Sequence, residues 1–131
     1  MPKVSVIIPT HNRAEFLRSA ITSVLNQTFQ DFEIVIIDDA SKDHTREIIT
    51  NFNDIRIKTI HNQFSKGDAG ARNIGIMNSN GEYIAFLDDD DEWLPEKLKM
   101  QIYLLDNSPS EVGGICTGRF TVKETDRRVF F

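Results

Sequence analysis

The stretch YIAFLDDDDEW, residues Tyr83–Trp93, places an apolar strand directly before five consecutive acids. Each buried carboxylate costs several kcal/mol unless a cation or a donor meets it, so we expect these acids at the exit of the strand and outside the core. The run Tyr83–Leu87 is continuously apolar, which is typical of a strand covered on both faces in a parallel sheet. Ligands of open parallel sheets bind outside the carboxyl ends of the strands, and the acids stand at such an end.

The acidic run allows two interpretations. Closely spaced carboxylates oppose one another's ionisation, and a bound Mg²⁺, Mn²⁺ or Ca²⁺ relieves that repulsion. A metal held by one or two acids with open positions typically meets a phosphate. The alternative is a solvated acidic turn ahead of a helix, because acids favour a helix N-terminus and Pro95 suits the first helical position. The run alone does not decide between them.

Composition limits the possible functions. The chain has 131 residues, long enough for one domain with a core, and its net charge of −5 argues against electrostatic binding of nucleic acid. No apolar run approaches a membrane span, and Val4–Ile8 is too short for a signal sequence, so we expect a cytoplasmic protein. The single Cys116 excludes an internal disulfide and is expected to be a small buried hydrophobe.

The hydrophobic pattern alternates between strands and helices along the chain. Asn12 and Glu15 have the spacing of a capping box, and Ser41 with Asp43 can cap the second helix. The predicted order is strand Lys3–Pro9, a helix from Asn12, strand Phe32–Ile37, a helix carrying Ile48 and Phe52, strand Ile55–Ile60, helix Ala69–Ser79, strand Tyr83–Leu87, helix Pro95–Leu105 and strand Gly113–Thr117. This order predicts a Rossmann-like α/β/α sandwich with a mainly parallel sheet.

Polar loops follow three of these strands, at Pro9–Arg13, Asp38–Asp43 and Asp88–Trp93. Parallel strands bring such loops to one edge of the sheet. Together they supply what a nucleoside diphosphate needs, with Arg72 from the following helix as a partner for phosphate.

Individual side chains in these loops have candidate roles and ordinary alternatives. Asp38 or Asp39 can accept hydrogen bonds from a base or ribose, and the ring of His11 can stack on a base. Singly, His11 is an ordinary loop histidine, Arg72 a helix surface charge, and the acid pair a turn and cap. Their joint occurrence at successive strand ends favours the binding roles.

Four segments resemble the family 2 glycosyltransferases, which have the GT-A fold. The segments are VSVIIPTHNR (Val4–Arg13), FEIVIIDDAS (Phe32–Ser41), GARNIGI (Gly70–Ile76) and GEYIAFLDDDDEWLPEKL (Gly81–Leu98). They follow the family's order and spacing. The resemblance implies an inverting enzyme that uses a nucleotide-activated sugar, usually a UDP-sugar, with Mg²⁺ or Mn²⁺ bound through a DXD motif.

The resemblance also implies roles for eight residues of this sequence. They are Pro9, Thr10 and His11 around the nucleoside, Asp39 at the base, Arg72 at the ribose or diphosphate, Asp88 and Asp89 on the ribose and sugar side, and Asp90 at the metal. His11 stands where a Tyr is commoner. Because four Asp residues are consecutive, the register of the metal ligand within Asp88–Asp91 stays open by one position.

The chain departs from the family pattern after the helix that follows Pro95. In relatives the catalytic base and the acceptor site lie further along, so we expect residues 1–131 to form a single donor-binding domain truncated before its acceptor half, with weak or no turnover alone. The resemblance implies a saccharide or lipid-linked acceptor, polysaccharide biosynthesis as the setting, and possible peripheral membrane contact. The apolar tail Val129, Phe130 and Phe131 is expected to favour homo-oligomers.

Two other classes of protein share some of these sequence features. A phosphoacceptor receiver domain has this length and strand-end acids, but its first strand would end in an acid pair where this one ends in Pro9 and Thr10, so we reject it. A non-catalytic nucleotide-binding or scaffold module stays open, because each candidate residue is a binding residue.

Overall fold

The computed structural model describes residues 1–122, 129 and 130, and the chain divides into two compact units, residues 1–99 and 100–131. The first unit contains strands β1 to β4 with helices α1 to α3, and α4 begins at its end. The elements are β1 (Val4–Thr10), α1 (Ala14–Leu25), β2 (Phe32–Asp38), α2 (Thr45–Asn51), β3 (Ile57–His61), α3 (Gly67–Met77), β4 (Tyr83–Phe86), α4 (Lys97–Asp106), β5 (Thr121–Val122) and β6 (Val129–Phe130).

The four strands of the first unit form one parallel sheet in the order β3-β2-β1-β4. Val4 opens the register on both sides of β1, opposite Phe32 of β2 and Tyr83 of β4. The prediction of an α/β fold with a parallel sheet is confirmed. The strand order switches direction at β1, because β2 and β3 are added on one side of β1 and β4 is added on the other. Crevices at such switch points bind ligands in open α/β sheets.

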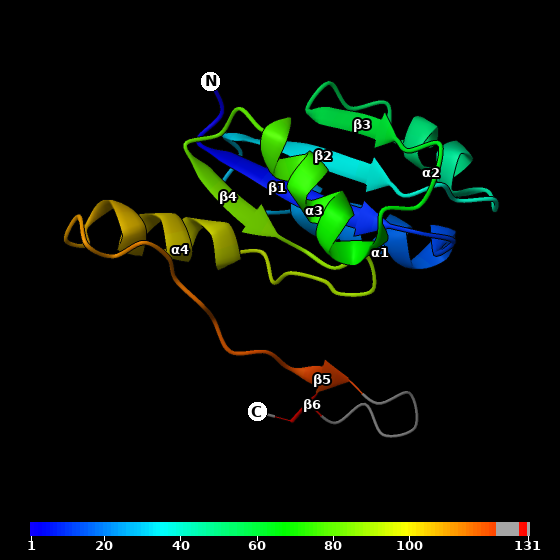
Figure 1. The fold of residues 1–131 in the computed structure, drawn as a ribbon. Helices are drawn as coiled ribbons and strands as arrows, with labels where there is room; N and C mark the ends of the chain where they lie inside the picture. The colour runs from blue at the N-terminus through cyan, green and yellow to red at the C-terminus, as the bar shows by residue number, and fades with distance from the viewer. Residues whose placement is uncertain (123–128, 131) are drawn as a thin grey trace. The chain divides into compact units, whose positions relative to one another are not determined.

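Helices cover both faces of the sheet (Figure 1). On one face α3 packs over β1 and β2, where Ala71 joins a buried cluster with Ile7, Val35 and Ile37. Gly75 makes this close approach possible, because a Cβ at that position would collide with the side chain of Ile7. Residues that alternate with this cluster along β1 and β2, such as Val6 and Ile36, are fully buried on the opposite side, which carries α1.

Strand β4 is less covered than its sequence predicts. Its alternate residues Ile84 and Phe86 are 38% and 47% exposed. The expectation of a strand buried on both faces is therefore wrong for the described residues, because β4 pairs there only with β1 and lies at the edge of the sheet. The continuous apolar run correctly predicts a parallel strand but not its position in the sheet.

The start of α1 also differs from the sequence expectation. The N-cap residue of α1 is Arg13, and the Arg13 side chain makes no capping hydrogen bond to the helix. Asn12 instead has a left-handed backbone with φ of 53°. The amide of Ala14 donates to the carboxylate of Asp43, 3.2 Å away on the loop after β2. A tertiary contact thus replaces the predicted capping box. Asp43 also accepts from the amide of Thr45, the first residue of α2, although the N-cap position itself is His44. Ser41, the other predicted cap of α2, accepts instead from the amide of Asn12.

The second unit contains the two-residue strands β5 and β6, which pair antiparallel. Residues 113–117 form no strand, so that prediction is wrong. The thiol of Cys116 is exposed, which contradicts its expected burial. Val129 and Phe130 of the apolar tail form β6, and Phe131 lies outside the described residues. Within the part of the chain that the structure describes, no helix combines the length and apolar character needed to cross a membrane.

Candidate functional site

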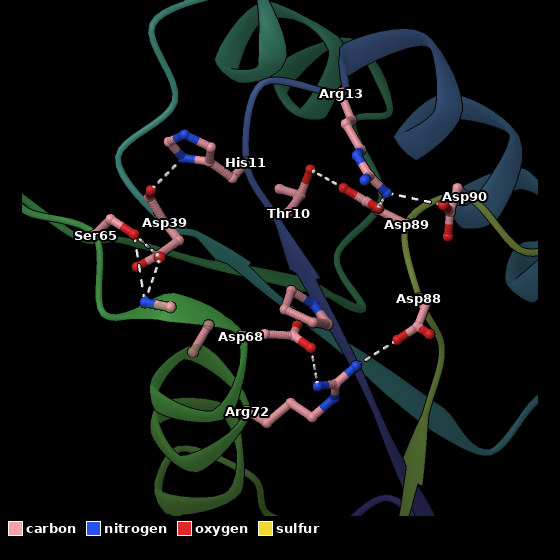
Figure 2. A pocket seen from close by; sticks show the side chains of 13 residues that line it. Thr10, His11, Arg13, Asp39, Ser65, Asp68, Arg72, Asp88, Asp89 and Asp90 are labelled. Atoms are coloured by element: carbon pink, nitrogen blue, oxygen red, sulfur yellow. Dashed lines mark hydrogen bonds and ion pairs between the residues drawn. The ribbon is translucent and has the colours of Figure 1, made fainter.

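A pocket of about 460 Å³ opens at the carboxyl ends of β1, β2 and β4, beside the N-terminal turns of α3. Its position is the switch point of the sheet order. All eight side chains singled out from the sequence line it, namely Pro9, Thr10, His11, Asp39, Arg72, Asp88, Asp89 and Asp90. Figure 2 shows His11 and Asp39 at one end of the pocket and Asp88, Asp89 and Asp90 at the other.

Asp39 is a buried anchor for the loop between β3 and α3. Its carboxylate accepts hydrogen bonds from the Asn62 side chain at 2.7 Å and from Ser65 Oγ at 2.6 Å. The amides of Lys66 and Gly67 donate to it as well, at 2.8 and 3.0 Å. Burial alone would raise the pKa of Asp39, but these hydrogen bonds outweigh it and hold the pKa below its ordinary value. The carboxylate therefore fixes the first turn of α3 beside the pocket.

The neighbouring Asp38 has a different place. It does not line the pocket, and its fully buried carboxylate accepts from the amide of Ser41 and meets His61 at 2.9 Å. Arg46 approaches the same carboxylate at 3.4 Å. Of the two residues that the sequence left open, Asp39 is the one at the pocket, and Asp38 ties the end of β2 to its own loop and to β3.

The orientation of His11 is fixed by two contacts. Its Nδ1 lies 2.7 Å from the carbonyl oxygen of Asp39, which can only accept, so Nδ1 carries the proton. Its Nε2 lies 3.0 Å from the Nδ2 of Asn12, whose Oδ1 accepts from the amide of Lys42. This chain of contacts assigns Nε2 as an acceptor and links the loops after β1 and β2. The imidazole ring is held at the pocket wall.

At the other end of the pocket, Asp88, Asp90 and Asp91 can each present one carboxylate oxygen within 4.8 Å of the others. Such a group of hard oxygens fits a divalent cation such as Mg²⁺ or Mn²⁺. Asp89 is not a member of the group. Asp88, Asp90 and Asp91 thus converge while Asp89 turns away, and the choice of metal ligand among them stays a prediction.

Asp89 is instead buried, with 6% of its surface exposed. Its carboxylate accepts a hydrogen bond from the hydroxyl of Thr10 at 2.8 Å and lies 3.3 Å from Nη1 of Arg13. Burial raises the pKa of Asp89 above its ordinary value, although Thr10 and Arg13 act in the opposite direction. Asp89 therefore connects the ends of β1 and β4.

Arginines balance the charge of the acids. Arg72 of α3 pairs with Asp68 one turn earlier and with Asp88 across the pocket (Figure 2). Arg13 pairs with Asp90 at 2.8 Å. Sequence reasoning identifies Arg72 as a site residue. It does not identify Arg13 or the remaining lining residues, which are Ser65, Gly67, Asp68 and Ala71. Arg13 lies within the polar loop after the first strand, and its place there was the one available signal.

Helix α1 holds the backbone that follows the acids. Ser23 Oγ accepts from the amide of Trp93, and the buried side chain of Gln27 bonds Leu94 and Leu98. Gln27 donates through Nε2 to the carbonyl of Leu94 at 2.8 Å and accepts through Oε1 from the amide of Leu98 at 2.9 Å. Both polar ends of this side chain are satisfied, so the exit of the acidic loop is fixed to the core.

The fold and the pocket together define an α/β protein with a polar, acid-lined binding site at its sheet switch point. Residues 5–129 match the family described as Glycosyl transferase family 2, and the chain belongs to that family. It is 44% identical over 102 residues to an Escherichia coli protein named UDP-Glc:alpha-D-GlcNAc-diphosphoundecaprenol beta-1,3-glucosyltransferase WfgD. It is 42% identical over 119 residues to a Campylobacter jejuni protein named GalNAc(5)-diNAcBac-PP-undecaprenol beta-1,3-glucosyltransferase. The matches cover 78% and 88% of this chain but only 40% and 38% of those relatives.

Solved structures give the same result. Residues 1–349 of TarS from Staphylococcus aureus, in complex with UDP-GlcNAc, match with a TM-score of 0.76 and 31% identity, over 79% of this chain and 31% of that one. The mannosyltransferase PcManGT from Pyrobaculum calidifontis, in complex with GDP-Man and Mn²⁺, matches with a TM-score of 0.74 and 25% identity, over 79% of this chain and 32% of that one. The fold is the GT-A type.

Proposed function

We propose that this chain binds the donor of a glycosyl transfer, a nucleotide-diphospho-sugar and most specifically a UDP-sugar, together with Mg²⁺ or Mn²⁺. The observation that carries the proposal is the convergence of Asp88, Asp90 and Asp91 at one end of a pocket whose other end holds His11 and Asp39. A nucleoside diphosphate has this polarity, with a flat base at one end and a charged, metal-binding diphosphate at the other. TarS and PcManGT were solved with such donors.

The residues divide along the pocket by their chemistry. Pro9, Thr10 and His11 border the nucleoside, and Asp39 lies at the base. Arg72 is placed to pair with the ribose or diphosphate, Asp88 lies on the ribose and sugar side, and Asp90 is the proposed metal ligand. Asp88 is also close enough to Asp90 to share that metal. Asp89 lines the pocket, but its carboxylate faces Thr10 and Arg13. We therefore propose that Asp89 acts on the sugar side by positioning its neighbours.

The proposed reaction is an inverting transfer of the sugar to an acceptor hydroxyl. When bound, the cation would neutralise charge that develops on the departing diphosphate. Arg72 adds a second positive group near the same place, since its guanidinium already bridges α3 and Asp88. The acceptor hydroxyl must lose a proton to a positioned carboxylate. We assign neither that base nor the acceptor site to residues 1–131.

We also propose an acceptor and a cellular location for this protein. Both curated relatives carry names that specify an undecaprenol-linked acceptor. A saccharide or lipid-linked saccharide is therefore the proposed acceptor, in polysaccharide biosynthesis, with the protein in the cytoplasm and peripheral at the membrane. Residues 1–131 are proposed to act as one donor-binding domain. Association into homo-oligomers through exposed apolar residues such as Ile84 and Phe86 is a further expectation.

Calorimetric titration of UDP tests the donor site. We expect binding in the presence of Mn²⁺ that weakens with EDTA and with Asp90→Ala. GDP serves as the matched ligand that keeps the diphosphate and changes the base. Equal binding with and without metal would overturn the metal role. No binding of either nucleotide would favour the non-catalytic scaffold that the sequence left open.

A further inference from the structure

Arg13 is a pocket side chain that contacts two members of the acidic run at once. Its Nη1 lies 2.8 Å from Asp90 Oδ2 and 3.3 Å from Asp89 Oδ1. The two acids differ strongly in environment, because the Asp89 side chain is 8% exposed and that of Asp90 is 47% exposed. Arg13 thus joins a fixed acid to an accessible one, and its own side chain is half exposed.

The fixed acid keeps the guanidinium in place. Asp89 cannot follow a moving partner, because Thr10 at the end of β1 donates to its other oxygen at 2.8 Å. Arg13 itself stands at the N-cap of α1, so its backbone is fixed as well. The contact with Asp90 is the shorter of the two, but Asp90 is exposed, so water competes for this ion pair and reduces its net stabilisation.

The same Asp90 carboxylate belongs to the group of acids that fits a divalent cation. A cation bound there and a guanidinium on the same carboxylate repel each other at short range. We propose that Arg13 is a positioning residue that neutralises Asp90 before the metal binds and releases it when the metal arrives, while Asp89 retains the arginine beside the pocket. This inference rests on the proposed metal-dependent function.

The proposal predicts the opposite effect from a merely structural role. If Arg13 competes with the metal, its removal should tighten Mn²⁺ binding. The metal then no longer has to displace the Arg13 guanidinium from the Asp90 carboxylate. If Arg13 only holds the acids in the geometry that the metal needs, its removal should loosen Mn²⁺ binding. The sign of the change therefore separates the two roles.

The experiment is titration of Mn²⁺ into the 131-residue protein, followed by the electron paramagnetic resonance signal of free Mn²⁺, with and without saturating UDP. We expect Arg13→Gln to tighten Mn²⁺ binding about two- to fivefold, the range for loss of an exposed ion pair. Arg13→Lys should remain close to wild type, because the charge is retained. Arg18→Gln is the matched control, since Arg18 is an exposed arginine of α1 that pairs with Glu15 away from the pocket. It should change the affinity less than Arg13→Gln.

The outcomes separate the inference from the function beneath it. Mn²⁺ binding that requires Asp90 but is unchanged or weakened in Arg13→Gln would overturn the role of Arg13 and leave the metal site intact. An equal increase of Mn²⁺ affinity in Arg18→Gln would mean that the change in net charge explains the result. That outcome would also overturn the proposed role of Arg13. If neither the wild type nor Arg13→Gln binds Mn²⁺, the proposed metal site fails together with the inference. A thermal melt of each variant identifies any loss of fold.

Discussion

The two ends of the pocket use acids in opposite ways. Asp39 is 4% exposed and receives its hydrogen bonds from the loop and first turn of α3. Asp88 and Asp90 are exposed, and they pair with the long side chains of Arg72 and Arg13. One end is built from short, buried hydrogen bonds to backbone and small side chains. The other is a set of charges balanced by long cationic side chains.

This difference indicates which acid supports the structure and which can change partners. A buried carboxylate with several donors leaves all of them unsatisfied when it is removed, so its loss is costly. An exposed ion pair contributes little stability, because solvent screens it and its side chains lose entropy when they pair. We therefore expect substitutions at the Asp39 end to affect stability and those at the Asp90 end to affect binding.

The largest expected effect is on stability at the Asp39 end. Asp39→Asn should lower the free energy of unfolding by about 2 to 4 kcal/mol, because an amide group then faces the amide donors of Lys66 and Gly67. Urea denaturation followed by circular dichroism measures it. Asp90→Asn is the matched control and should cost less than about 1 kcal/mol. Equal losses in the two variants would remove the distinction between the two ends.

The next effect is on ligand binding at the acid end. Asp90→Asn should weaken Mn²⁺-supported UDP binding by about tenfold or more, because the amide loses the charge that a hard cation needs. Calorimetry of the folded variant gives the affinity. Asp91→Asn tests the other end of the register, and we expect a smaller loss there. A larger loss in Asp91→Asn would move the principal metal ligand by one residue.

A smaller effect is expected in the pH dependence of stability. The pKa of Asp39 is lower in the folded protein than its ordinary value, so its contribution is present above about pH 4 and is lost as the pH falls through the folded pKa. The destabilisation by Asp39→Asn should therefore be larger at pH 6 than at pH 2.5. Urea midpoints at the two pH values measure this. A difference that grows toward acid pH would contradict the assigned hydrogen bonds.

The smallest effect concerns the arginine on the α3 side. Arg72→Gln should change the free energy of unfolding by less than about 1 kcal/mol, since its partners Asp68 and Asp88 are both exposed. We expect the same variant to weaken UDP binding more than it weakens the fold. Thermal melts and UDP titration of one preparation provide both values. If Arg72→Gln lowers the free energy of unfolding as much as Asp39→Asn does, Arg72 holds α3 in place.

Much of this arrangement follows from local sequence. The β-branched runs before Thr10 and Asp38 predict parallel strands, and parallel strands bring their carboxyl ends together. That is sufficient to gather Thr10, His11, Asp39 and the acids at one edge. The sequence alone does not decide whether Asp38 or Asp39 faces the pocket. Two adjacent residues at a strand end point to opposite sides, and the packing of α3 against the sheet determines which side carries the pocket.

Other features depend on contacts between distant segments. Asn12 and Glu15 fit a capping box, but Asp43 from another loop caps the helix. Arg13 is a generic loop residue until β4 brings Asp89 and Asp90 beside it. The exposure of Ile84 and Phe86 follows from the edge position of β4, which the strand's own residues do not encode.

The most direct test of the two-ended site is anomalous X-ray diffraction from crystals of the protein grown with UDP and Mn²⁺. We predict one Mn²⁺ peak within coordination distance of a carboxylate oxygen of Asp90, with Asp88 beside it, and the uracil ring against His11 near Asp39. Arg13 should then contact Asp89 and no longer Asp90. A peak at Asp39, or UDP bound with its base toward the acids, would contradict the account.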